Sequence, residues 1–126
     1  MPKTILITGG SRGIGAATAL LAAQRGYAVC LSYLHNQAAA ENVVASIEAL
    51  GGQARAFRAD VALESDVVAL FERIDAEVGP LAALVNNAGI LERQMRVDHM
   101  DAARLQRIFA TNVIGSFLCA REAVLR

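Results

Sequence analysis

Residues 8–15 read TGGSRGIG, a glycine-rich segment that follows the apolar run Ile5–Ile7 and precedes a stretch with helical character. A glycine at position 9 permits a tight turn, while Gly13 and Gly15 allow a phosphate and a neighbouring strand to approach the backbone. A helix that starts near Gly13 directs its first free N–H groups, and the positive end of its dipole, at an anion placed there. The segment therefore predicts a diphosphate site. Because its glycine order departs from G-x-G-x-x-G, a plain glycine turn stays open as the alternative.

Polar residues also follow later apolar runs of the chain. Asp60 and Val61 end the third run, where the carboxylate also suits the start of a cap for the following helix. The segment NNAG at residues 86–89 follows the fourth run, where it could contribute to a site. The alternative is a simple Asn/Gly turn. Asn112 lies within a long apolar helical pattern, where a polar side chain costs free energy unless it is hydrogen-bonded. A bond from Asn112 to local backbone is its simplest structural explanation.

These residues need elements that bring them together, and the sequence alternates strand and helix patterns. Short β-branched or apolar runs predict strands, and apolar residues at helical spacing predict the helices between them. The expected strands are KTILIT, YAVCLSY, QARAFRAD and LAALV, at residues 3–8, 27–33, 53–60 and 81–85, and the expected helices cover residues 13–25, 37–50, 62–79 and 101–126.

Each expected helix has an apolar face for packing on the sheet, and Gly115 is a local weak point in the last one. The expected faces are Ile14, Ala17 and Leu21 in the first helix, Val43, Ile47 and Leu50 in the second, Val67, Leu70, Phe71, Ile74 and Val78 in the third, and Leu105, Ile108, Phe109, Val113, Phe117 and Val124 in the last.

Short strands that alternate with longer helices predict right-handed β–α–β crossovers and a parallel sheet covered on both faces. The expected fold class is therefore α/β, a Rossmann-type doubly wound sheet of three layers, with its first four strands and their helices in these residues. No repeat, hinge or linker divides residues 1–126, so we expect a single domain. Ligands in such sheets bind beyond the carboxyl ends of the strands, where the polar residues described above are found.

Composition narrows the range of partners. The chain has 126 residues, with 12 Lys+Arg against 12 Asp+Glu, and lacks the basic excess that attracts nucleic acid or an anionic membrane surface. No apolar stretch reaches the roughly 18–20 residues of a membrane span. Cys30 and Cys119 lie in separate apolar segments, so we expect buried free thiols and a cytoplasmic location. His35 and His99 have no second ligand at metal spacing, and we expect no metal site.

Read together, TGGSRGIG, Asp60–Val61, the NNAG segment and Asn112 resemble the short-chain dehydrogenase/reductase family, in order and at similar intervals over all 126 residues. The resemblance implies a nicotinamide dinucleotide site in which Asp60 and Val61 frame the adenine. Asn86 would tie the central strand to its neighbours. The residues implied beneath the adenosine and its ribose are Asn87, Ala88 and Gly89, and those implied for the pyrophosphate and ribose are Gly9, Ser11, Arg12, Gly13, Ile14 and Gly15.

The choice of cofactor depends on the end of the second strand, Ser32–His35. Dinucleotide folds that select NAD carry an acid there, which accepts from the ribose 2′-hydroxyl and repels a 2′-phosphate. Tyr33 takes that place in this chain, and Arg12 offers a guanidinium for a 2′-phosphate. We therefore expect NADP(H). NAD(H) stays open because Leu34 replaces the arginine that many similar NADP-dependent members have.

The resemblance also implies a reaction. Members pass a hydride between the nicotinamide and a carbonyl or secondary alcohol, while a Tyr, assisted by a Lys and a Ser, handles the hydroxyl proton. Asn112 would support this by helping to hold a water that relays protons to the Lys. Tyr27, Tyr33 and Lys3 do not match the family's Tyr and Lys, which lie beyond this helix. We expect a chain truncated before its catalytic segment, which alone binds cofactor weakly and shows no turnover.

Three functions follow from these residues. The leading one is an oxidoreductase acting on a small carbonyl or alcohol, and the alternatives are a non-catalytic dinucleotide-binding or regulatory module and a structural α/β module with an empty loop. The resemblance implies a homo-oligomer, a dimer or tetramer, paired through the last helix. Phe117 and Val124 suit that interface or an intrachain core equally, and completion of the chain by a further segment is the other expectation.

Overall fold

The computed structural model describes all 126 residues as four strands with helices between them. A short 3-10 turn precedes α4, and a π-helical turn separates α4 from α5. No helix has the length and apolar character needed to cross a membrane. The elements are β1 (Thr4–Ile7), α1 (Gly13–Gln24), β2 (Ala28–Tyr33), α2 (Gln37–Ala49), β3 (Gln53–Arg58), α3 (Glu64–Glu77), β4 (Leu81–Val85), the 3-10 turn Val97–His99, α4 (Ala102–Phe109), the π-helical turn Ala110–Ile114 and α5 (Gly115–Val124).

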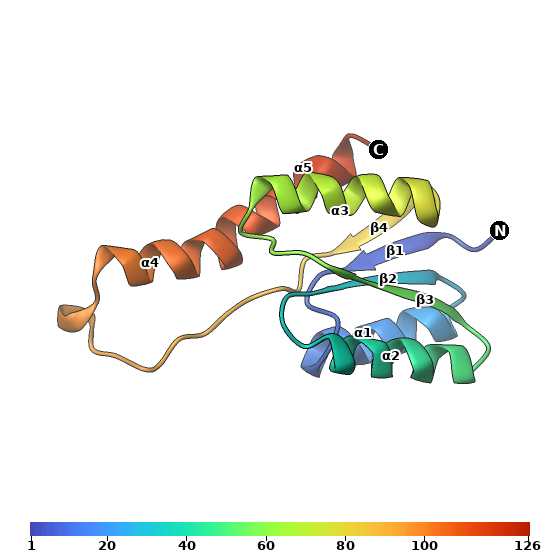
Figure 1. The fold of residues 1–126 in the computed structure, drawn as a ribbon, viewed down its shortest axis with the longest axis horizontal. Coiled ribbons are helices and arrows are strands. Elements are labelled where there is room, and N and C mark those ends of the chain that lie inside the picture. The colour runs from blue at the N-terminus through green and yellow to red at the C-terminus, as the bar shows by residue number, and fades with distance from the viewer.

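The strands form one parallel sheet in the order β3-β2-β1-β4, which confirms the expected α/β class. In the centre, Leu6 on β1 lies between Cys30 on β2 and Leu84 on β4. Helices α1 and α2 cover one face of the sheet, and α3 and α5 cover the other, giving three layers (Figure 1). The chain adds β2 and β3 to one side of β1 and then places β4 on the other side, so the direction of winding reverses between β1 and β4.

The amphipathic helices pack mainly as their patterns predict. In α3, the side chains of Val67, Leu70, Phe71 and Ile74 are buried against the sheet, and Val78 packs at the edge of the same cluster. These four buried residues form one apolar stripe, and the opposite face of the helix is charged. Only the apolar stripe can therefore pack against the sheet.

The second helix requires one correction to its expected face. Val43 and Ile47 of α2 are buried, as expected, and Ala40 joins them. Leu50 is exposed, because α2 ends at Ala49 and Leu50 forms its C-terminal cap, whose N–H bonds to the Ile47 carbonyl. The chain changes direction at Gly51, with φ +84°, and the side chain of Leu50 therefore does not reach the core.

The expected face of α1 is wrong. Ile14 is 80% exposed and Leu21 is 49% exposed, whereas Gly15, Ala19 and Ala22 face the sheet. Almost every residue of this helix is apolar or small, so the sequence carries no contrast between faces. The structure turns the smallest residues inward, which lets the α1 backbone approach the sheet closely.

The last helix also differs from its prediction, because the π-helical turn interrupts it and its apolar stripe is not buried. Phe117 is 74% exposed and Val124 is 85% exposed, which excludes the intrachain core as their environment in this chain. Leu105, Phe109 and Val113 are exposed as well, and Ile108 is half-buried. Helix α4 extends away from the sheet (Figure 1), and α5 instead turns Gly115, Cys119 and Glu122 inward.

Gly115 shows why α5 packs by so narrow a face. A side-chain Cβ at this position would lie 2.8 Å from the carbonyl oxygen of Val61 and 2.9 Å from its Cγ2 atom. The start of α5 therefore rests directly on the backbone that follows β3. The weak point expected at Gly115 is a contact that only glycine permits.

Both cysteines are free and buried, as expected. Cys30 on β2 and Cys119 on α5 belong to the apolar cluster between the sheet and α3. Burial raises the pKa of the Cys30 thiol to about 12 and that of the Cys119 thiol to about 11. Both thiols are therefore protonated at neutral pH, which makes them poor nucleophiles.

The orientation of α1 can be tested by two substitutions on its opposite faces. Ala19→Leu adds a large side chain where Ala19 is fully buried, and we expect it to lower the free energy of unfolding by about 1–3 kcal/mol. Leu21→Ala on the exposed side should change it by less than about 1 kcal/mol. Urea unfolding followed by circular dichroism measures both. A larger loss from Leu21→Ala than from Ala19→Leu would contradict this orientation.

Candidate functional site

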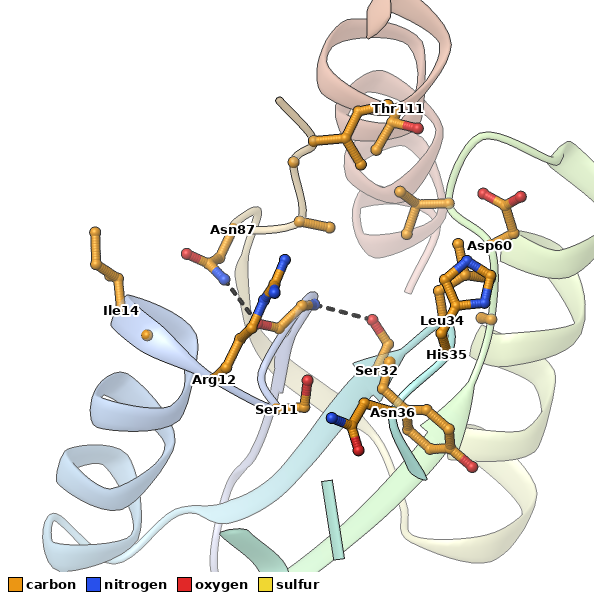
Figure 2. A pocket seen from close by; sticks show the side chains of 18 residues that line it. Ser11, Arg12, Ile14, Ser32, Leu34, His35, Asn36, Asp60, Asn87 and Thr111 are labelled. Carbon is orange, nitrogen blue, oxygen red and sulfur yellow. Dashed lines mark hydrogen bonds between the residues drawn. The ribbon is translucent and has the colours of Figure 1, made fainter. Parts of the chain in front are cut away.

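A cavity of about 530 Å³ opens at the carboxyl ends of the strands, where the sheet reverses its winding. The loops after β1, β2, β3 and β4 all contribute to its wall, together with the π-helical turn (Figure 2). The residues that line it are Gly9, Ser11, Arg12, Gly13, Ile14, Ser32, Tyr33, Leu34, His35, Asn36, Ala59, Asp60, Val61, Asn87, Ala88, Gly89, Ile90 and Thr111.

Thr8 and Asn87 join the loops that follow β1 and β4. The Thr8 hydroxyl oxygen accepts hydrogen bonds from the backbone N–H groups of Asn87 and Ala88, both at 3.0 Å. In return, the Asn87 side-chain amide donates to the backbone carbonyls of Thr8 at 3.0 Å and Gly9 at 2.9 Å. Thr8 is fully buried, so its hydroxyl satisfies two N–H groups that have no ready access to water.

The glycine loop fits this junction only because two of its residues lack side chains. Gly9 has φ +64°, in the left-handed region. A Cβ at Gly15 would lie 2.2 Å from the Gly9 carbonyl oxygen and 2.5 Å from the Asn87 amide nitrogen. Gly15 therefore does not line the cavity but lets α1 begin directly behind the loop.

The N-terminus of α1 faces the cavity without a side-chain cap. Arg12 precedes the helix in extended conformation and makes no capping bond, and the first helical bond runs from Ala16 N–H to the Arg12 carbonyl. By contrast, Asn36 caps α2 and Asp101 caps α4. The N–H groups of the first turn of α1 thus have no helical partner, and the helix dipole adds positive potential, which together suit an anion.

The charges in the cavity wall are few. Arg12 forms no ion pair with another side chain, and Asp60 is the single carboxylate among the lining residues. The end of β2 contributes Tyr33, Leu34 and His35, without an acid. The end of β2 therefore contributes no negative charge to the wall, and Arg12 contributes a guanidinium without an ion-pair partner.

Asp60 lines the cavity and also shapes the turn into α3. Its Oδ1 atom accepts from the backbone N–H of Ala62 at 3.0 Å, just before α3, and its own N–H donates to Asp66 Oδ2 at 2.8 Å. These bonds shape the turn into α3. The carboxylate makes no other hydrogen bond within the chain, so its second oxygen is available to a ligand in the cavity that Asp60 lines.

Asn112 lies outside the cavity wall, in the π-helical turn. Its side-chain Oδ1 accepts from the Ile90 N–H at 2.7 Å, and its Nδ2 donates to the Ile90 carbonyl at 2.9 Å. The side chain thus bonds to backbone, but to a residue 22 positions away rather than to local backbone. The pair fixes Ile90, which follows the NNAG segment and lines the cavity.

Two arginines of α4 hold the segment that continues from Ile90. Arg107 makes two hydrogen bonds of 2.9 Å to the Glu92 carboxylate, and these lower the pKa of that carboxyl. Buried Arg104 donates to the Arg93 carbonyl at 2.6 Å. No pattern in the sequence predicts these contacts, because hydrogen bonds between a loop and a helix leave no periodic signal.

Of the residues expected to bind cofactor, all but Gly15 contribute to the cavity wall. Sequence reasoning missed Thr8 and Ser32, which organise the loop: the Ser32 hydroxyl accepts from the Gly9 N–H at 3.2 Å (Figure 2). It also missed Thr111. Asn86, expected to tie the central strand to its neighbours, donates from its side chain to the Ser116 carbonyl of α5 at 3.0 Å. No group of three or more His, Cys, Asp or Glu side chains is arranged to hold a metal ion.

Comparisons with known proteins agree with this architecture. A family model described as short chain dehydrogenase matches residues 3–126. An uncharacterized oxidoreductase YgfF from Escherichia coli (strain K12) is 54% identical over 121 residues, covering 96% of this chain and 49% of the relative. The 3-oxoacyl-[acyl-carrier-protein] reductase FabG of Staphylococcus aureus (strain N315) is 37% identical over 123 residues, covering 98% of this chain and 50% of its own length.

A solved structure shows the same likeness. The dehydrogenase/reductase from Sinorhizobium meliloti 1021 superposes with a TM-score of 0.95 at 36% sequence identity, over 98% of this chain and 49% of that protein. The chain therefore spans about half the length of the curated relatives and solved structures that it matches.

Removing the Thr8 hydroxyl tests how far the junction of the two loops depends on it. Thr8→Val keeps the shape of the side chain but leaves the Asn87 and Ala88 N–H groups unpaired, so we expect the free energy of unfolding to fall by about 1–3 kcal/mol. Thr8→Ser keeps the hydroxyl and should be the more stable variant, although it buries less apolar surface. Denaturant unfolding of both variants ranks them, and a valine variant as stable as the serine variant would refute this role.

Proposed function

The chain belongs to the short-chain dehydrogenase/reductase family, and we propose that the whole protein is an NADP(H)-dependent oxidoreductase that passes a hydride between the nicotinamide and a small carbonyl or secondary alcohol. The observation that carries the choice of cofactor is the unpaired Arg12 at an uncapped helix N-terminus, together with the absence of an acid at the end of strand β2. The named relatives are an oxidoreductase and a reductase, which favours an enzyme over a non-catalytic binding module.

The donor set of the cavity fits a dinucleotide diphosphate. Gly9, Ser11, Gly13 and Ile14 surround the first turn of α1, whose N–H groups lack helical partners, and Gly15 lets the helix begin close behind them. A diphosphate at this place would receive backbone hydrogen bonds and the favourable helix dipole. The adenosine would then extend toward Asp60 and Val61, over the backbone of Asn87, Ala88 and Gly89.

The preference for NADP(H) over NAD(H) follows from charge. A 2′-phosphate adds about two negative charges, which an acid at the end of β2 would repel and a guanidinium would attract. Tyr33 supplies no charge at that position, and Arg12 has no carboxylate partner that would compete for it. Tyr33 would lie beside the adenosine ribose in this arrangement.

The dinucleotide, when bound, would supply or accept the hydride of the reaction. The residues of this chain would bind and orient it, and the paired hydrogen bonds between Asn112 and Ile90 would keep the wall after the NNAG segment in place. Asn112 is in this sense a supporting residue, with the water-mediated proton relay implied by the family as its further role. The proton donor and its partners would lie outside residues 1–126.

We place the protein in the cytoplasm, since two buried free thiols suit a reducing compartment. We also expect a homo-oligomer. Phe109 in α4, Val113 in the π-helical turn and Phe117 in α5 recur at four-residue intervals, and all three are exposed. An apolar stripe of this kind is costly in water and suits burial against a second copy or a further segment of the protein.

Titration of the complete protein with NADPH and NADH, followed by nicotinamide fluorescence, tests the cofactor. We expect NADPH to bind more tightly, and Arg12→Ala to weaken NADPH binding about tenfold or more while changing NADH binding little, because a charge-assisted contact to phosphate is lost. Arg25→Ala is a matched control at the other end of α1, where an exposed arginine forms no ion pair. NADH binding tenfold more tightly than NADPH would overturn the assignment.

A further inference from the structure

Residues 91–109, which we call the arm, extend away from the sheet and are held together without an apolar core. The arm leaves the cavity wall after Ile90, passes through the 3-10 turn and returns along α4 (Figure 1). Its single buried residue is Arg104, which is 8% exposed, whereas Leu91 is 97% exposed and Val97 82% exposed. Arginine is almost never fully buried unless it is paired, so its place here needs a reason.

The Arg104 guanidinium is incompletely satisfied in this position. Its Nη2 atom donates to the Arg93 carbonyl at 2.6 Å, and it forms no ion pair with a carboxylate. Its Nε–H is buried and has no hydrogen-bond partner. An arginine stays charged whatever its surroundings, and a buried donor without a partner lowers stability. An apolar side chain of similar length would cost less free energy, so stability does not explain this arginine.

Three side chains from α4 and the π-helical turn hold the segment of residues 90–93, in antiparallel order. The pairs are Asn112 with Ile90, Arg107 with Glu92, and Arg104 with Arg93. Arg104 and Arg107 are three residues apart and therefore share one side of α4. The residue that the π-helical turn inserts lets Asn112 reach the same segment. The segment is thus fastened along the helix at three successive points.

Arg104 affects two of these three points. Its guanidinium is the donor that holds the Arg93 carbonyl. Its charge also acts on Glu92: hydrogen bonds from Arg107 lower the pKa of that carboxyl most, and the positive charges of Arg107 and Arg104 lower it further. The third point is Ile90, which lines the cavity and directly precedes the arm. Loss of Arg104 would therefore leave Ile90 held by Asn112 alone, beside a loosened segment.

We propose that Arg104 is a positioning residue: its buried guanidinium fixes the course of residues 90–93 and so keeps Ile90 in the cavity wall before a ligand binds. Arg104 does not line the cavity itself and acts only through this segment. For its effect on binding, the inference rests on the proposed dinucleotide function. A wall that is already ordered saves the ligand the free energy of ordering it, which offsets the unpartnered Nε–H.

Arg104→Met in the complete protein tests this role, because methionine retains an unbranched apolar stem but removes the charge and every donor. We expect amide hydrogen exchange of residues 90–96 in the free protein to become about tenfold faster. The dissociation constant of NADPH, followed by nicotinamide fluorescence, should rise about three- to tenfold, since only part of the population then has an ordered wall. The urea midpoint of unfolding should not fall, because a buried unpaired donor is removed.

Two further variants provide the controls. Arg104→Lys keeps a positive charge and a donor for the Arg93 carbonyl, and should keep the dissociation constant within about twofold of that of the unmodified protein. Arg96→Met makes the same exchange within the arm, at a side chain that is 83% exposed and pairs only with Asp98, two residues later. It should change neither the exchange rates of residues 90–93 nor the binding of NADPH.

The outcomes separate this inference from the proposed function. Failure of the unmodified protein to bind NADPH or NADH would contradict the proposed function, while the exchange rates still test the hold of Arg104 on the segment. Unchanged exchange in Arg104→Met, or faster exchange with unchanged affinity, would overturn the positioning role. A lower urea midpoint, a failure to fold, or a lysine variant as weak as the methionine variant would overturn it as well. Faster exchange and weaker NADPH binding at an undiminished urea midpoint support it.

Discussion

The hydrogen bonds between Thr8 and Asn87 hold together the two loops on which the cavity depends. Parallel strands place their carboxyl ends at one edge, but the reversal between β1 and β4 leaves two polar backbones facing each other there. Each side chain satisfies backbone groups of the opposite loop that would otherwise be unpaired. The glycines follow from this constraint, since a side chain at Gly15 would occupy the place of the Asn87 amide.

Once Thr8 and Asn87 have joined the two loops, the chemistry of the site depends on the polar groups that have no partner within the chain. Helix α1 starts without a cap, Arg12 has no carboxylate, and one oxygen of Asp60 is free. Two other helices begin with a side-chain cap, α2 with Asn36 and α4 with Asp101. The uncapped start of α1, Arg12 and Asp60 all border the cavity. The end of β2 and Arg12 are the features on which the proposed preference for a 2′-phosphate depends.

The strands and α3 were predictable from the sequence because their apolar patterns fit only one type of element and one buried face. Alternating apolar runs and glycine stops mark β1 to β4, and the stripe in α3 has a charged opposite face. The face of α1 was not predictable, since its helix is apolar on all sides and the packing depends on backbone approach. The glycine loop and Asp60 were found from their place after strands. Thr8 and Thr111 were missed because a threonine that follows a strand or lies within a helix has no distinguishing local pattern.

The contact between Thr8 and Asn87 also determines when the cavity can form during synthesis of the chain. Thr8 and Asn87 are 79 residues apart, so a nascent chain that has emerged only as far as β3 has the glycine loop but not its partner. Contacts of such long sequence separation form late, after the entropy of closing the intervening chain has been overcome. The proposed nucleotide would therefore find no complete cavity until β4 docks beside β1, and its binding would stabilise the finished sheet.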